Sequence, residues 1–137
     1  MVATTDTHKL REKIASVDEF HRVFGIGSLE SPEGTIDEKD YMLRYNLMKE
    51  ENEEYLDACK KGDLVEIADA LGDKMYILFG TILKHGLQDK IADVFDEIHR
   101  SNMSKLDENG KPIYREDGKI LKSSRYFKPD IRSVLEK

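Results

Sequence analysis

Two helical segments that meet at Gly62 constrain the fold of this 137-residue chain more than any other feature. Capping-box spacing at Thr35 predicts a helix that runs to Lys61, where Gly62 ends it. The same spacing begins a second helix at Asp63, which stops near Gly86. Because the connection at Gly62 is so short, we expect the two helices to be antiparallel neighbours.

Shorter elements are expected on both sides of this helical pair. In chain order they are a short helix at 16–24 that begins on a capping pattern at Ser16, a loop at 25–34, a helix at 88–104, two short strands at 112–115 and 119–121, and a short helix or tail from Pro129. Asp117-Gly118 is a turn dipeptide, and it predicts that the two strands form a hairpin. The sequence thus predicts an all-α fold, an antiparallel helical bundle with a small C-terminal β-hairpin, in a single domain spanning residues 1–137.

Charge and cysteine content argue against several classes of function. Twenty-two Lys and Arg against 28 Asp and Glu give a formal net charge of −6, which disfavours a general binder of nucleic acid or of anionic membranes. The longest apolar run, 75–83, is shorter than the 20 or so residues that a membrane-spanning helix needs. Cys59 is the only cysteine, so neither an intrachain disulfide nor a multi-cysteine zinc site can form. We therefore expect a soluble, cytoplasmic protein.

Carboxylates lie on helix faces that we expect to be buried. In the first long helix, Glu51 and Glu54 fall within the stripe of apolar residues that contains Leu47. In the second, Glu66 and Asp69 share one face of a helix so poor in basic residues that we expect it to pack on several sides. Both pairs lie within about two to three turns of Gly62, so the four carboxylates should converge on one site.

Convergence of these acids predicts a metal site with oxygen ligands alone. A buried, unpaired carboxylate costs several kcal/mol unless it is protonated or binds a cation, and such ligands suit Mg²⁺ or Mn²⁺ better than zinc or copper. A single pair of acids three residues apart is usually a solvated helix face, but two such pairs at similar distances from one turn favour the metal site. Glu50 lies at the edge of the stripe. Asp73 is either a further ligand or a polar residue that faces water.

The acid pairs, together with a polar run near residue 100, resemble the all-α nucleoside triphosphate pyrophosphatases. This group includes the MazG-like proteins, the dimeric dUTPases and phosphoribosyl-ATP pyrophosphohydrolase. The resemblance is closest from Glu50 to Lys105, and it includes the segments 67–73 and 99–105. It implies hydrolysis of a nucleoside triphosphate to the monophosphate and pyrophosphate, assisted by Mg²⁺, in homodimers or homotetramers. The residues that the resemblance assigns are Glu51, Glu54, Glu66 and Asp69 as metal ligands, and Asn102 and Lys105 as contacts to the sugar or phosphates.

Further polar side chains are candidates to bind the nucleotide. Asn102 and Lys105 continue the apolar stripe of the helix that precedes them, so they either line a ligand cavity or emerge into solvent. Lys122, Arg125 and Tyr126 follow the hairpin and either close over phosphates or form an exposed basic segment.

The sequence therefore predicts a Mg²⁺-dependent nucleotide pyrophosphohydrolase. A water activated by metal would attack a phosphorus of the triphosphate, and Glu50 or Glu51 would accept its proton. The alternative is a non-catalytic helical protein that binds metal or nucleotide as a sensor or partner. A third interpretation is a purely structural bundle.

Overall fold

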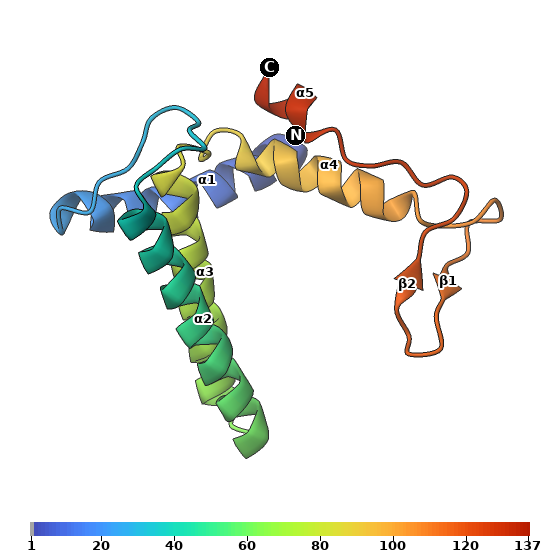
Figure 1. The fold of residues 1–137 in the computed structure, drawn as a ribbon, viewed down its shortest axis with the longest axis horizontal. Helices are drawn as coiled ribbons and strands as arrows, with labels where there is room; N and C mark the ends of the chain where they lie inside the picture. Colours follow the sequence, from blue (N-terminus) through green and yellow to red (C-terminus); the bar gives the residue numbers. More distant parts are fainter. Residues whose placement is uncertain (1) are drawn as a thin grey trace. The chain divides into compact units, whose positions relative to one another are not determined.

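A computed structural model describes the backbone of residues 2–137 and the side chains from residue 8 onward. Over these residues the chain is all-α with one small antiparallel hairpin, as predicted (Figure 1). The elements are α1 (Val2–Val23), α2 (Glu38–Lys61), α3 (Leu64–Lys84), α4 (Ile91–Met103), β1 (Ile113–Tyr114), β2 (Ile120–Leu121) and α5 (Ile131–Leu135). None of the helices described is long and apolar enough to cross a membrane.

The chain forms two compact units, one ending at Asp89 and the other beginning at Lys90. The first unit holds α1, α2 and α3. The second holds α4, the hairpin and α5, and in its hairpin Ile113 pairs with Leu121.

The turn between α2 and α3 forms as the sequence predicts. Gly62 adopts the left-handed conformation with φ of 65°, which suits glycine because it lacks a Cβ. The carboxylate of Asp63 accepts hydrogen bonds from the backbone N–H groups of Val65 and Glu66, at 3.0 and 3.2 Å. These two residues reverse the chain, so α2 and α3 lie antiparallel and side by side (Figure 1).

Two predicted helix starts are wrong, and a third is shifted by three residues. The hydroxyl of Ser16 donates to the carbonyl of Glu12, so this serine is satisfied inside α1 and caps nothing. Thr35 lies in the loop, where its N–H donates to Glu33, and α2 begins at Glu38 after Asp37. The helix expected from residue 88 begins at Ile91. Ser16 and Thr35 are residue types that suit a cap, but here each takes part in another local hydrogen bond.

The loop before α2 covers the C-terminal end of α3. The N–H of Leu29 donates to the carbonyl of Leu83, and the N–H of Glu33 donates to that of His85, both at 2.9 Å. These bonds satisfy carbonyls that the end of a helix leaves free. Gly86 makes this approach possible, because a Cβ at that position would lie 2.0 Å from the carbonyl oxygen of Ser31.

Arg44 connects α2 to α3 near this end of the antiparallel helical pair. Its side chain is buried, and the guanidinium donates to the carbonyl of Ile77 and the hydroxyl of Thr81, at 2.9 and 3.1 Å. Gly80 leaves room for it, since a Cβ there would lie 2.6 Å from Nη2 of Arg44. This contact ties α2 to α3 at the end of the pair that lies away from Gly62.

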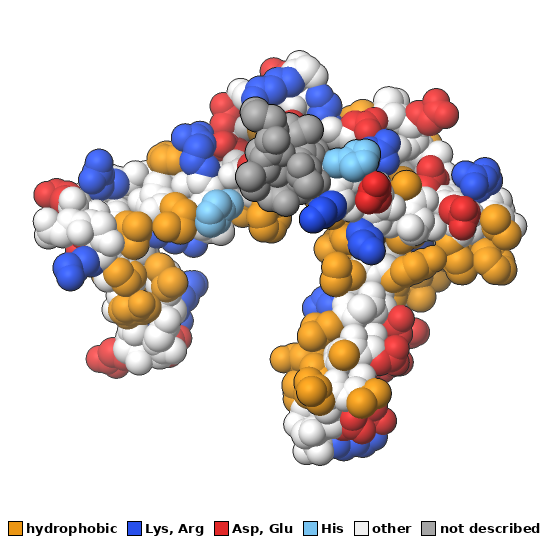
Figure 2. All heavy atoms as spheres, turned by 180° about the vertical axis from the view of Figure 1, so that it is seen from behind, with side chains coloured by type: hydrophobic (Ala, Val, Ile, Leu, Met, Phe, Trp, Pro, Cys, Tyr) orange, Lys and Arg blue, Asp and Glu red, His pale blue; other side chains and the backbone are white. Residues whose placement is uncertain are grey.

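One face of α3 is apolar, and neither α1 nor α2 covers it. On α3, the side chains of Leu64, Leu71, Met75 and Leu78 are 77, 46, 53 and 46% exposed. Figure 2 shows hydrophobic side chains gathered along the α2–α3 pair, next to acidic ones. As predicted, α3 packs on more than one side, against α2 and α1, but within the first unit these two helices leave the stripe exposed.

The contact at Gly86 can be tested against Gly62. Both residues have positive φ, 66° and 65°, so an alanine at either position costs about 1–2 kcal/mol of backbone strain. Only at Gly86 would the added methyl collide with another backbone segment. We expect Gly86→Ala to lower the free energy of unfolding, measured by urea denaturation, by at least about 1 kcal/mol more than Gly62→Ala does. Equal losses would contradict the docking of the loop.

Candidate functional site

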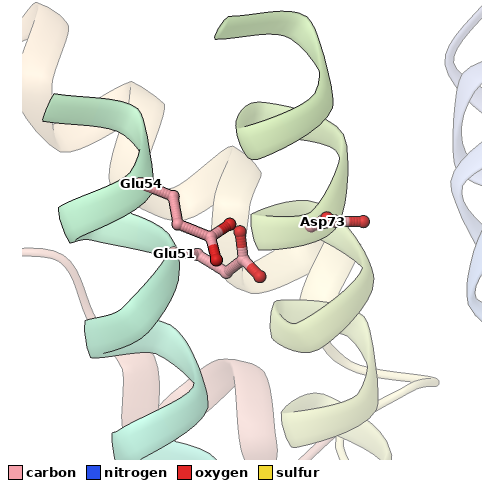
Figure 3. Close-up of side chains that lie close together, drawn as sticks. All are labelled: Glu51, Glu54 and Asp73. Atoms are coloured by element: carbon pink, nitrogen blue, oxygen red, sulfur yellow. The ribbon is translucent and has the colours of Figure 1, made fainter. Parts of the chain in front are cut away.

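Three carboxylates from α2 and α3 come together on the surface of the helical pair, where Glu51 is half-buried and Glu54 and Asp73 are exposed. Glu51, Glu54 and Asp73 each offer one oxygen, and these oxygens lie within 4.8 Å of one another. In Figure 3, the carboxylates of Glu51 and Glu54 lie side by side and point from α2 toward α3, which carries Asp73. We call these three residues the acid cluster. Since divalent cations bind oxygens at about 2.0–2.6 Å, one ion could contact all three side chains.

Local helix geometry explains why these residues meet. Glu51 and Glu54 are three residues apart and Asp69 and Asp73 are four apart, so each pair occupies one face of its helix. Between this region and Gly62 the buried side chains are small, since Ala58 and Ala70 are 2 and 3% exposed. Small residues let the two backbones approach, and the acids on both helices are then brought close together.

Glu51 carries the strongest electrostatic signal in the cluster. Its Oε2 is buried and has no hydrogen-bond partner among the described residues. Burial raises the pKa of Glu51 to about 7, and the negative charges of Glu54, Asp73 and Asp69 add to this effect. A group that cannot easily keep its charge in the bare protein would be stabilised by a cation.

Asp73 shows the same effect from the other helix. Burial raises its pKa, and the charges of Asp69 and Glu54 raise it further. The two helices thus hold more negative charge than their surroundings neutralise, and the acid cluster could bind a metal ion.

A cavity of about 290 Å³ lies nearer the turn. The residues that line it are Glu54, Asp57, Lys61, Glu66, Asp69 and Ala70. Glu54 belongs to both the cavity and the acid cluster, so the two are adjacent. Within the cavity, Nζ of Lys61 lies 3.6 Å from Oε2 of Glu66.

The four predicted metal ligands therefore occupy different places in one acidic region. Glu51 and Glu54 belong to the acid cluster. Asp69 lies close enough to influence the pKa values of Glu51 and Asp73, and it also lines the cavity. Glu66 lines the cavity as well, where it pairs with Lys61.

Two further acids are now placed. Asp73, which the sequence left open, belongs to the acid cluster, and its position one helical turn after Asp69 was the available signal. Glu50, one of the two predicted general bases, is exposed and is not part of the cluster.

The predicted nucleotide contacts all lie in the second unit. Asn102 is exposed and Lys105 is partly exposed at the end of α4. Nζ of Lys122 lies 4.8 Å from the ring centroid of Tyr126, a cation–π contact that holds these two side chains together.

Serine hydroxyls attach the segment after β2 to the end of α4. Ser101 donates to the carbonyl of Phe127 at 2.8 Å, and Ser123 donates to that of Leu106 at 2.6 Å. A cavity of about 320 Å³ lies there, and its lining includes Arg125. The second unit thus presents basic and aromatic side chains beside a cavity of its own.

Comparison with known protein families identifies the family of this chain. A family model described as phosphoribosyl-ATP pyrophosphohydrolase matches residues 17–102, more than half of the chain. The matched segment contains the whole acid cluster and the adjacent cavity, and it ends at Asn102, before Lys105, Lys122 and Tyr126. No match was found among the curated proteins.

The raised pKa of Glu51 has a consequence for stability. Because its pKa is about 7 in the folded protein against an ordinary 4.5, the folded state holds this proton more tightly, and stability falls as the pH rises from about 4.5 to 7. We expect Glu51→Gln to raise the free energy of unfolding of the metal-free protein at pH 8 and to change it little at pH 4. Urea denaturation in EDTA at both pH values measures this.

Glu53→Gln is the matched control, since Glu53 is exposed on α2 and is not part of the acid cluster. It should leave stability nearly the same at both pH values. A Glu51→Gln protein that is less stable than the wild type at pH 8 would refute the assignment.

Proposed function

The chain belongs to the phosphoribosyl-ATP pyrophosphohydrolase family, and we propose that it hydrolyses a nucleoside triphosphate or related nucleotide to the monophosphate and pyrophosphate. Membership confirms the resemblance read from the sequence. The observation that carries the proposal is the buried, unpartnered Oε2 of Glu51 beside Glu54 and Asp73. Such an oxygen calls for a cation, and cations are what the phosphates of a nucleotide need in order to bind an acidic protein.

The metal in this proposal is Mg²⁺, with Mn²⁺ as a substitute. The predicted ligands Glu51, Glu54, Glu66 and Asp69 would hold it, and Asp73 joins them because it lies in the acid cluster. All are carboxylates, which such hard cations prefer. When bound, the metal would neutralise phosphate charge and lower the pKa of the attacking water.

Glu51 is the better candidate of the two predicted general bases. It lies in the acid cluster, whereas Glu50 is exposed outside it. A base must reach the proton that it accepts, so position decides between them. We therefore assign proton acceptance to Glu51.

Nucleotide binding is proposed for residues of the second unit. Asn102 and Lys105 offer amide and ammonium donors at the end of α4. Lys122 and Tyr126 form a basic, aromatic pair after the β-hairpin. Such groups suit a sugar and its phosphates. The family match crosses the boundary between the two units, which supports treating residues 1–137 as one functional domain.

Association into a homodimer or homotetramer is also proposed. The exposed stripe of Leu64, Leu71, Met75 and Leu78 on α3 is of the kind that protein–protein contacts cover. A second copy of the chain would bury it. The cytoplasmic location stays a prediction from the single cysteine.

Activity can be tested with a panel of ribo- and deoxyribonucleoside triphosphates in Mg²⁺, with pyrophosphate release as the measurement. We expect turnover that EDTA abolishes and that Glu51→Gln reduces at least about a hundredfold, with helicity retained. Glu66→Gln and Asp73→Asn should also reduce it, and Glu53→Gln should not. Tight nucleotide binding without product would favour the sensor, and no metal-dependent binding at all would leave a structural bundle.

Assembly can be tested by analytical ultracentrifugation. We expect the wild type to sediment as a dimer or tetramer, and Leu71→Lys to shift it toward the monomer because a charge on the stripe opposes burial. Val23→Lys is the control, since Val23 is 69% exposed at the end of α1. A wild-type protein that stays monomeric at micromolar concentration would contradict the proposal.

A further inference from the structure

Lys61 is the one basic residue among the six that line the cavity beside the acid cluster. It is the last residue of α2, directly before the turn at Gly62. Four of the other lining residues carry carboxylates, namely Glu54, Asp57, Glu66 and Asp69. A polyphosphate entering this cavity would therefore meet a single ammonium group among several like charges.

The ion pair of Lys61 with Glu66 is one that a ligand can displace. Its N–O distance is 3.6 Å, and the two side chains are 66 and 49% exposed. Exposed pairs of this kind contribute little to stability, because solvent screens them and two long side chains must be ordered. The ammonium group can thus leave Glu66 for a more highly charged partner at small cost.

A phosphate is such a partner for Lys61. It carries more negative charge than a carboxylate, and lysine binds phosphate as a flexible point charge. Because Lys61 stands across from Glu66, the exchange would also free Glu66, one of the proposed metal ligands, at the moment the phosphate arrives.

We propose that Lys61 binds a phosphate of the nucleotide and of the product pyrophosphate, and that its ion pair with Glu66 holds the ammonium group at the cavity until then. This inference rests on the proposed function and adds a phosphate-binding residue to it. Lys61 contributes charge to substrate binding, and the general base remains Glu51.

The test is isothermal titration of inorganic pyrophosphate with Mg²⁺ into the full chain and its variants. We expect Lys61→Met to weaken pyrophosphate binding about tenfold or more, as the loss of a charge-assisted hydrogen bond implies. Lys61→Arg should restore most of it, because the charge is kept. Lys60→Met is the matched control, an adjacent exposed lysine that does not line the cavity, and it should bind like the wild type.

A second titration, with Mn²⁺ alone, separates phosphate binding from metal binding. We expect Lys61→Met to bind Mn²⁺ at least as tightly as the wild type, because the variant has lost a cation that competes for Glu66. Weaker Mn²⁺ binding would overturn the proposal, as would unchanged pyrophosphate binding in Lys61→Met or a wild type that binds no pyrophosphate.

The nucleotide assay distinguishes this proposal from the function on which it rests. A wild-type protein that binds pyrophosphate through Lys61 but hydrolyses no nucleotide would refute the function and leave the binding residue. Turnover with the same KM in Lys61→Met and the wild type, together with unchanged pyrophosphate binding, would refute the role of Lys61 alone.

Discussion

Mutual repulsion among carboxylates held together by α2 and α3 is the constraint on which the site depends. Glu51, Glu54 and Asp73 lie so close that burial and charge raise the pKa values of Glu51 and Asp73. In a folded protein such repulsion persists only where a ligand compensates for it or where other contacts fix the backbone. The antiparallel pair of α2 and α3 supplies such contacts through the turn at Gly62 and the hydrogen bonds of Arg44 to α3. The acids are thus arranged for a cation before one binds.

How far the sequence predicts this structure depends on the range of each signal. The turn at Gly62 and Asp63 could be predicted because its hydrogen bonds are local. The start of α1 could not, since serine favours a cap but also occurs inside a helix, where its hydroxyl can bond to the carbonyl four residues earlier, as Ser16 does. The position of Asp73 one turn after Asp69 places both on one face of α3, but membership in the acid cluster also depends on how α2 and α3 are rotated toward each other, which no local pattern encodes.

Apolar periodicity shows the same limit in another form. The stripe that contains Leu71 and Met75 was recognisable, but its period indicates only that this face avoids water, not which element covers it. Within the chain α2 and α1 take other parts of α3.

The pair of α2 and α3 therefore has two unfavourable features. The acid cluster has an excess of negative charge, and the apolar stripe on α3 is exposed. A cation would reduce the first and a second copy of the chain would cover the second. Any ligand that binds only the folded α2–α3 pair shifts the folding equilibrium of that pair toward the folded state. Cation binding and association with a second copy therefore stabilise the same element. Metal binding and assembly would then reinforce each other, even if no residue contacts both the metal ion and the second copy. Each raises the population of the α2–α3 conformation that the other requires.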